Sequence, residues 1–291
     1  MHDYPALAAL AEVLRRGSFE GAAMALRVTP SAISQRIKGL EDRLGQVLIQ
    51  RGPPLAGTEA GLRLARHVEQ VHLLEASLGA DLMPETGPRR LSLAVNADSL
   101  ASWVLPALAS QEGLLYDLTI DDQDHSADWL KRGAVVAAVT SDPGPLPGCD
   151  TAALGALRYI ATASPVYLAR WFPQGLTAEA LAEAPALTFN AKDRLQIDWA
   201  SRQTGRRISP PTHIIGSSQA FIEAATLGLG WGMNPEPLIR SHLAAGTLIP
   251  LDPKAPLDVA LYWQSLRAMK GPLAPLTAAV RQAARAVLIP I

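Results

Sequence analysis

Apolar residues recur at helical spacing between positions 29 and 45. They fall at intervals of four, three and four residues, which puts them on one face of a helix: Ile33, Ile37, Leu40 and Leu44. Thr29 has the hydroxyl of a good N-cap, Pro30 suits the first helical position, and Gly45 suits the C-cap. The pattern therefore predicts a helix that begins at Pro30, ends near Leu44 and packs its apolar face on a core.

The other face of this helix is polar, and its side chains are of the kinds that contact duplex DNA. Hydroxyls, an amide and an ammonium group project together, with a guanidinium at the flank, and such groups suit base edges and phosphates in a major groove. The candidate DNA-binding residues here are Thr29, Pro30, Ser31, Ser34, Gln35, Arg36 and Lys38. A small helical bundle with a solvated face would show the same spacing and is the alternative.

A short helix and a tight turn precede this segment. Ser18 can cap a helix whose small residues at positions 21, 22, 23 and 25 allow a neighbouring helix to pack closely. Few residues remain for the turn between Leu26 and Thr29, and residues 4–16 form one more helix that closes a three-helix core. Two short helices, a tight turn and a polar-faced second helix predict a helix-turn-helix.

The chain after the polar-faced helix predicts a wing, a hairpin beside the helix-turn-helix. Val47 to Gln50 is a short strand-like run, and the glycine and proline cluster from Gly52 to Gly57 forces a turn. Arg51 stands at the start of this hairpin, and we expect it to reach the DNA backbone or the minor groove. The alternative is an exposed arginine at the end of a strand.

A long helix is predicted from Thr58 to about Leu82. It has a heptad-like seam at intervals of three and four residues, with one polar member: Gly61, Leu64, Val68, Val71, Glu75, Leu78 and Leu82. At ~1.5 Å per residue the helix is roughly 35–40 Å long, more than one small domain needs, so we expect it to pair with a second copy. The predicted dimerisation residues are Leu64, Val68, Val71, Leu78 and Leu82. A single helix buried under a large domain is the alternative.

From Leu91 onward the pattern changes to short apolar strands that alternate with helices. A βαβαβ series with parallel strands follows between positions 91 and 142, and a similar series follows Ser164. The segment 258–264 is expected to return to the first series, and 275–288 to form a terminal helix. This order predicts two α/β lobes joined by crossing strands. Ligands in such bodies lie between the lobes, at the carboxyl ends of strands.

Two predicted strand-to-helix turns carry groups that suit an amino-acid ligand. Free amides at a helix N-terminus bind a carboxylate well, and a cluster of aspartates is unfavourable unless a cation joins it. The candidate effector-binding residues are Asn96, Asp98, Ser99, Asp121, Asp122, Asp124, Ser217 and Ser218. In the alternative, Asp98 and Ser218 only cap helices and the aspartates form a solvated turn. Trp103 and Trp263 are expected in the core.

Composition narrows the class of protein. The chain has 291 residues, 48% of them hydrophobic, and is long enough for two or more folded domains. It has one cysteine, Cys149, and its six histidines show no ligand spacing, so we expect no disulfide, no metal and no cofactor. The sequence shows no catalytic motif, secretory signal or membrane-spanning run, and we expect a cytoplasmic location.

The charge is distributed unevenly along the chain. The net charge of the chain is −1; residues 1–66 carry +3, residues 67–90 carry −2 and residues 91–291 carry −2. This is the sign expected for a basic DNA-binding head on an acidic body. Because the excess is small, DNA affinity would depend on two heads that share the phosphate contacts.

Several of these segments resemble the LysR-type transcriptional regulators. The resemblance is carried by Ala22-Ala23, the run TPSAISQRIKGLEDRLG, Arg51 and the TEAG that opens the long helix. It implies an α/β protein with a winged helix-turn-helix (1–57), a linker and dimerisation helix (58–83), a hinge (84–90) and a two-lobed effector domain like a periplasmic binding protein. In that domain, residues 91–163 and 258–291 would form lobe I, and residues 164–257 would form lobe II.

One branch of this family senses lysine or arginine and controls basic-amino-acid exporters, and further segments resemble that branch. They are Asn96-Ala97-Asp98-Ser99, Ser217-Ser218 and Tyr262-Trp263. The chain departs from the family in two places. Gln35 stands where the family usually has arginine, and the wing lacks a second basic residue, which weakens the expected minor-groove contact.

Together these observations predict a dimeric or tetrameric DNA-binding regulator that is gated by lysine or arginine. The expected partners are an operator duplex, the small effector, a second copy of the chain and RNA polymerase; no enzyme activity and no membrane partner is expected. An effector that bridges the lobes would change their closure and re-aim the paired heads. The alternatives are a LysR-type regulator for another metabolite, and a cytoplasmic two-lobed solute-binding protein or enzyme.

Overall fold

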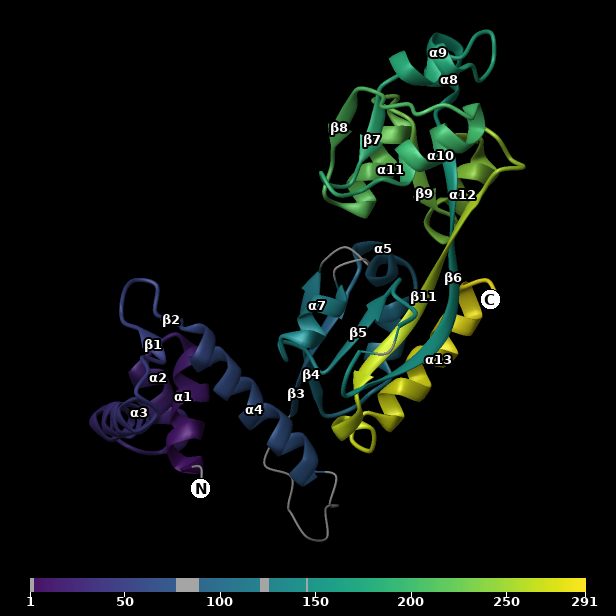
Figure 1. Ribbon diagram of the computed structural model, residues 1–291. Coiled ribbons are helices and arrows are strands. Elements are labelled where there is room, and N and C mark those ends of the chain that lie inside the picture. Colours follow the sequence, from purple (N-terminus) through teal and green to yellow (C-terminus); the bar gives the residue numbers. More distant parts are fainter. Residues whose placement is uncertain (1–2, 77–88, 121–125, 145) are drawn as a thin grey trace.

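The chain forms a small head, a long helix and a two-lobed body (Figure 1). A computed structural model describes residues 3–76, 89–120, 126–144 and 146–291. The head holds the first three helices, α4 leads from it toward lobe I, and lobe II lies beyond lobe I at the top of the view. Two long strands, β6 and β11, run from one lobe into the other.

The head is a three-helix bundle around one apolar core. Its helices are α1 (Tyr4–Arg16), α2 (Phe19–Leu26) and α3 (Pro30–Leu44), and the side chains of Asp3, Ser18 and Thr29 cap them by accepting from first-turn amides. The core includes Leu7, Leu10, Val13, Ile33, Ile37 and Leu40. The predicted helix-turn-helix is therefore confirmed. Leu44 differs from the prediction, because at the end of α3 it is 43% exposed.

The predicted wing is a short hairpin that packs on the start of the linker helix. Strands β1 (Ile49–Gln50) and β2 (Ala56–Gly57) pair antiparallel, and α4 (Glu59–Ala76) follows directly. The Thr58 hydroxyl donates to the carbonyl of Val47 at 2.8 Å and accepts from the amide of Gly61. A Cβ added at Gly61 would lie 2.1 Å from the carbonyl oxygen of Leu48, so only glycine lets the wing approach this closely.

Part of the predicted seam of the linker helix α4 packs against the head of the same chain. Val68 is 3% exposed in the core of the head, and Leu64 packs against the same core. Val68 is therefore buried within its own chain, which corrects the prediction that it meets a second copy. Leu64 and Val71 keep part of their surface, and their pairing with a second copy stays a prediction. Leu78 and Leu82 lie outside the described residues. Like every other helix in the described part of the chain, α4 is not long and apolar enough to span a membrane.

Lobe I is built on the predicted βαβαβ unit. Strand β3 (Arg89–Val95) pairs parallel with β4 (Leu114–Ile120) and with β5 (Ala137–Thr140). The first crossover is α5 (Ala97–Ser99), a π-helical turn (Leu100–Val104) and α6 (Leu105–Ala109), and the second includes α7 (Ser126–Lys131). One boundary differs from the prediction, because Arg89 and Arg90, expected in the hinge, belong to β3.

The crossing strands join the lobes into one sheet. β6 (Cys149–Ala163) is a single strand of 15 residues that pairs antiparallel with β11 (Leu257–Leu266), and β11 also pairs with β5. The sheet order is β10-β6-β11-β5-β3-β4, and β9 also pairs with β6. A short 3-10 turn (Arg267–Met269) and α13 (Ala274–Val287) end the chain on lobe I. The predicted return of the chain to lobe I is confirmed.

Lobe II shows the predicted series of helices and strands after Ser164. Its helices are α8 (Pro165–Trp171), α9 (Ala178–Glu183), α10 (Leu195–Thr204), α11 (Ser218–Thr226) and α12 (Glu236–Ala245). Its short strands are β7 (Ala186–Thr188), β8 (Thr212–Ile214), β9 (Gly232–Pro235) and β10 (Ile249–Pro250). Because β9 contains glycine and proline, its sequence carries no local strand signal.

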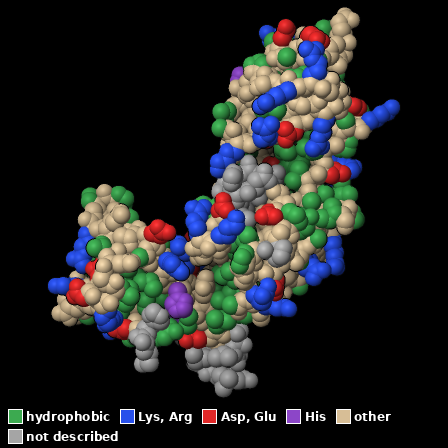
Figure 2. Space-filling view, viewed as in Figure 1, with side chains coloured by type: hydrophobic (Ala, Val, Ile, Leu, Met, Phe, Trp, Pro, Cys, Tyr) green, Lys and Arg blue, Asp and Glu red, His purple; other side chains and the backbone are tan. Residues whose placement is uncertain are grey.

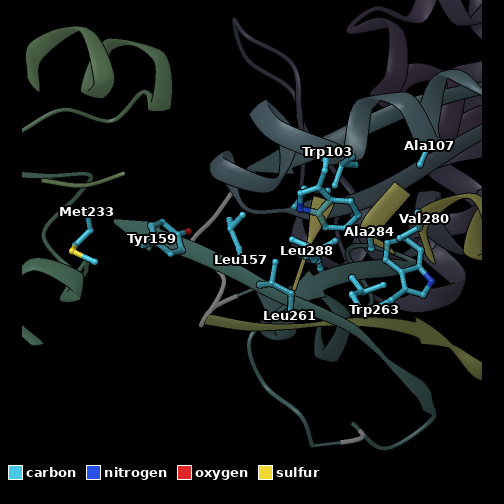
Figure 3. Close-up of a cluster of buried hydrophobic side chains, with 14 of the residues drawn as sticks. Trp103, Ala107, Leu157, Tyr159, Met233, Leu261, Trp263, Val280, Ala284 and Leu288 are labelled. Carbon is cyan, nitrogen blue, oxygen red and sulfur yellow. The ribbon is translucent and has the colours of Figure 1, made fainter. Parts of the chain in front are cut away.

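One apolar cluster follows the crossing strands through the body. Figure 3 shows Trp103 and Trp263 packed with side chains of α13 and β11, and Tyr159 and Met233 farther along β6 and β9. Both tryptophans are buried, as predicted. The tyrosine ring at position 159 is equally buried, so the polar end of that side chain must find a partner inside the protein.

Candidate DNA-binding surface and inter-lobe site

The polar strip of α3 lies on the outer side of the head. The side chains of Thr29, Pro30, Ser31, Gln35 and Lys38 are exposed, and those of Ser34 and Arg36 are half-buried. Figure 2 shows basic side chains along this outer edge of the head. The opposite face of α3 is fixed in the core through Ile33, Ile37 and Leu40, so the strip is held rigidly toward solvent.

The first turn of α3 is ordered by hydroxyl groups. Thr29 Oγ1 accepts from the amide of Ala32 at 3.2 Å and lies 3.0 Å from Ser31 Oγ. A helix N-terminus carries partial positive charge and unsatisfied amides, which attract phosphates. Residues near the N-terminus of a recognition helix are also those that reach base edges in helix-turn-helix complexes.

Arg51 is held beside the helix-turn-helix by two contacts. Its guanidinium lies 4.0 Å from the carboxylate of Glu41 and 5.8 Å from the centre of the Phe19 ring at the start of α2. Glu41 also accepts the amides of Leu48 and Ile49, which ties the base of the wing to α3. Arg51 therefore stays exposed at a defined place near the start of α2. Local sequence gives no signal for this role of Glu41.

In the body, Asp98 links the two lobes. Its Oδ1 accepts the hydroxyl of Ser218 at 2.6 Å, and its Oδ2 accepts the hydroxyl of Tyr159 at 2.8 Å. Asp98 belongs to α5 of lobe I, Ser218 is the first residue of α11 in lobe II, and Tyr159 lies on the crossing strand β6. Hydrogen bonds to a carboxylate are stronger than neutral ones, so this contact stabilises the approach of the lobes.

The helix caps at this contact are the neighbours of the linking residues. Asn96 Oδ1 accepts the amide of Ser99 at 2.8 Å, and Ser217 Oγ accepts the amide of Ala220. The alternative in which Asp98 and Ser218 merely cap their helices is therefore wrong. Because Asn96 and Ser217 already occupy first-turn amides, a ligand carboxylate would depend on side-chain hydroxyls more than on those amides.

Ser99 follows Asp98 directly in the chain and carries a buried hydroxyl. Its side chain is fully buried, and its Oγ makes no hydrogen bond within the described ranges. A buried hydroxyl without a partner is unfavourable, so a ligand oxygen or an ordered water would be stabilised there. Ser102, one turn later, donates to the backbone carbonyl of Asp98 and fixes the start of the helix.

The structure adds residues that local sequence does not indicate. Tyr159 lies within an apolar run, so nothing marks its hydroxyl as a partner of Asp98. Gln264 on β11 donates to the carbonyls of Asp142 and Gly144 at 2.8 Å and fixes the loop after β5. That loop lies at the same sheet edge as Asn96, because β3 and β5 are parallel. Asp121, Asp122 and Asp124 lie outside the described residues.

These features define a class of protein: a winged helix-turn-helix regulator with a two-lobed ligand-binding body. Comparison with known families agrees. Residues 5–62 match the family of bacterial regulatory helix-turn-helix proteins of lysR type, and residues 85–285 match the LysR substrate binding domain. The chain belongs to the LysR family of transcriptional regulators. It is thus a DNA-binding regulator gated by a small effector, and not an enzyme.

Relatives with known names are similar over nearly the whole chain. The regulator LysG of Mycobacterium tuberculosis is 43% identical over 284 residues, which cover 97% of this chain and 93% of LysG. The crystal structure of ArgP from Mycobacterium tuberculosis has a TM-score of 0.83 and 42% identity, with all of both chains covered. Full-length LysG from Corynebacterium glutamicum with bound effector Arg has a TM-score of 0.70 and 37% identity, covering 99% of this chain and 100% of that one.

Proposed function

We propose that the effector of this regulator is a basic amino acid, arginine or lysine, bound between the lobes at Asp98. The observation that carries the proposal is the carboxylate of Asp98 at the contact of the two lobes, whose oxygens would accept from an ammonium or guanidinium group. The buried hydroxyl of Ser99 would take the carboxylate end of the same molecule. The arginine bound to the LysG relative supports this choice.

Binding would change the link between the lobes. A cationic group that takes one oxygen of Asp98 competes with the hydroxyl of Ser218, which belongs to lobe II. The ligand then makes unequal contacts with the linked and the rearranged body, which is the requirement for shifting the equilibrium between them. The side chain of Ser217 caps the start of α11 without using Ser218, so this cap can stay in place when Ser218 loses its bond to Asp98.

A calorimetric titration of the full chain tests the effector. Arginine and lysine are expected to bind, and citrulline, which has nearly the shape of arginine without its charge, is expected to bind much more weakly. Equal binding of citrulline and arginine would contradict a role for the Asp98 charge. If neither basic amino acid binds and another metabolite does, the second candidate, a regulator for that metabolite, takes its place.

We infer that DNA binding uses the head in the manner of its fold. The polar strip of α3 (Ser31, Ser34, Gln35, Arg36 and Lys38, with Thr29 and Pro30 at its start) enters a major groove, and Arg51 contacts the backbone beside it. A band-shift assay on the DNA upstream of its own gene tests this. Specific binding should weaken steeply with salt, and binding that shows no preference over unrelated DNA would contradict the inference.

We further propose a dimer or tetramer that works in the cytoplasm, recruits RNA polymerase and controls a basic-amino-acid exporter gene. The units proposed are the head (1–57), the linker helix (58–83), the hinge (84–90) and lobes I and II, with the exposed part of Val71 and positions 78 and 82 pairing two chains. Size-exclusion chromatography with light scattering tests the assembly. A chain that stays monomeric at all concentrations would contradict it.

A further inference from the structure

The linker helix α4 packs on lobe I of its own chain around a small cavity. The cavity has a volume of about 10 Å³, close to the space that one water molecule needs and too small for an effector. Its lining comes from α4, from β3 and from the turn before β5: Arg66, Glu69, Gln70, Leu73, Arg90, Ser92 and residues 133–136. This contact is separate from the inter-lobe site at Asp98.

Two apolar side chains fix α4 to two different parts of the protein. Val68 lies in the core of the head, and Leu73, five positions later, is 4% exposed in the core cluster of the body. A continuous helix that is buried at both points sets the orientation of the head relative to lobe I. If Leu73 leaves lobe I, the head is free to take another orientation.

Glu69 lies between these two anchors and faces charges from every side of the junction. Burial raises the pKa of its carboxyl above 4.5, and Arg90 of β3 opposes that shift without cancelling it. The other charged neighbours are Asp117 of β4, which raises the pKa, and Arg66 and Arg15, which lower it. Burial therefore outweighs the attraction of the cations, and an ionised Glu69 weakens the docked arrangement.

At Arg66, too, the effect of burial outweighs the attraction of the opposite charges. Its Nε is buried and has no hydrogen-bond partner within the described residues, and burial lowers the pKa of its guanidinium. A water in the cavity can accept from this donor, but the docked protein offers it no acceptor among the described residues. The polar side of the junction thus opposes the apolar contact of Leu73 and leaves the docking weak.

We propose that lobe I carries a docking site for the linker helix, and that Glu69 and Arg90 keep the helix only marginally docked so that it can leave and re-aim the head. Arg90 favours docking because its charge compensates the half-buried carboxylate of Glu69, and Glu69 itself opposes docking. The consequence for transcription rests on the proposed function, but the docking itself does not.

A thiol at the docked surface measures the docking directly. In Leu73→Cys, the new cysteine reacts with a maleimide only when α4 leaves lobe I, and the native Cys149, 2% exposed in the core, gives a slow background. In this variant Glu69→Gln is expected to slow labelling and Arg90→Gln to accelerate it, each about two- to fivefold, the range of partly exposed charge interactions. Glu183→Gln on α9 is the matched control and is expected to change nothing.

The double variant shows whether the two residues act on each other. With Gln at position 69, the Arg90→Gln effect should nearly disappear, because the charge that Arg90 compensates is gone. Equal labelling of the Glu69→Gln and Glu183→Gln variants, or an undiminished Arg90→Gln effect beside Gln at position 69, would overturn the proposal. If Leu73→Cys unfolds the chain, hydrogen exchange of the α4 amides is measured in variants that keep Leu73. The exchange should then be slower in Glu69→Gln and faster in Arg90→Gln than in the unaltered chain. None of these measurements needs effector or DNA, so a failure of the proposed function would not be mistaken for a failure of the docking.

Discussion

Asp98→Asn is expected to remove most of the affinity for arginine and lysine while it leaves the fold intact. Asparagine has the shape of aspartate without its charge. The hydroxyls of Ser218 and Tyr159, which now lie 2.6 and 2.8 Å from the carboxylate, can donate to the amide oxygen or accept from the amide nitrogen. Both contacts can therefore persist as neutral hydrogen bonds.

The magnitude of the effect differs for stability and for binding. Hydrogen bonds to a charged group contribute about 1.5–3 kcal/mol and neutral ones about 0.5–1.5 kcal/mol, so each contact should weaken by about 1 kcal/mol. Loss of one partner of a hydrogen-bonded charge pair costs about 2–5 kcal/mol in binding. Asp98 is half-buried, so the lower end applies, roughly 2–3 kcal/mol or about 30- to 150-fold in Kd.

Calorimetric titration with arginine and lysine measures this loss, and thermal unfolding without ligand measures the change in stability. The matched control is Asp198→Asn on α10, which removes the same charge from an exposed pair with Arg194. It should bind arginine as the unaltered chain does. An Asp98→Asn chain that is folded and binds arginine within threefold of the unaltered chain would refute the assignment of the cation to Asp98.

Three further predictions concern the head and the linker helix. Lys38→Ala should weaken binding to all DNA sequences alike and lower the salt dependence of binding by about one ion per head, whereas Gln35→Ala should relax the sequence preference. Band-shift assays measure both variants, with Lys192→Ala on lobe II as the control. Gly61→Ala should lower the free energy of unfolding by about 3 kcal/mol, because its Cβ meets the Leu48 carbonyl. Gly39→Ala in mid-helix should raise the free energy of unfolding by about 0.5–1 kcal/mol, because its Cβ makes only an ordinary 3.8 Å contact with the Arg43 side chain; equal changes in urea unfolding of the two variants would contradict this prediction. The folded chain holds the Glu69 proton more tightly than the unfolded chain, so stability should fall as pH rises from 4.5 through the raised pKa, and Glu69→Gln should remove that part of the pH dependence.

The head follows from its sequence because its signals are local. The caps Asp3, Ser18 and Thr29 and the apolar stripe of α3 each lie within a few residues of the groups they contact. The seam of α4 shows the limit of such signals. A stripe at intervals of three and four residues indicates that a helix packs on something, but not whether Leu64 and Val68 meet a second copy or their own head.

The inter-lobe site depends on contacts between distant positions. Asp98 meets Tyr159 and Ser218, which stand 61 and 120 residues away in the chain. The sequence marks Asp98 and Ser218 through their strand-to-helix turns, but the direct bond between them appears only once the crossing strands bring the lobes together. No local sequence pattern predicts a role for Tyr159 or the pairing of β9 with β6, because both depend on contacts between distant parts of the chain.

Strand β3 connects the inter-lobe contact at Asp98 with the junction between lobe I and α4. Its carboxyl end leads through Asn96 to Asp98, and its amino end carries Arg90 at the junction with Glu69 of α4. Seven residues at ~3.3 Å each put these ends roughly 20 Å apart. β3 is hydrogen-bonded to β4 along its whole length and to β5 near its carboxyl end, so it resists bending. If both proposals hold, a displacement of Asp98 by an effector would be carried along β3 as a movement of the whole strand, and the contact of α4 with lobe I would be the one that yields. The head would then turn without any change in its own core.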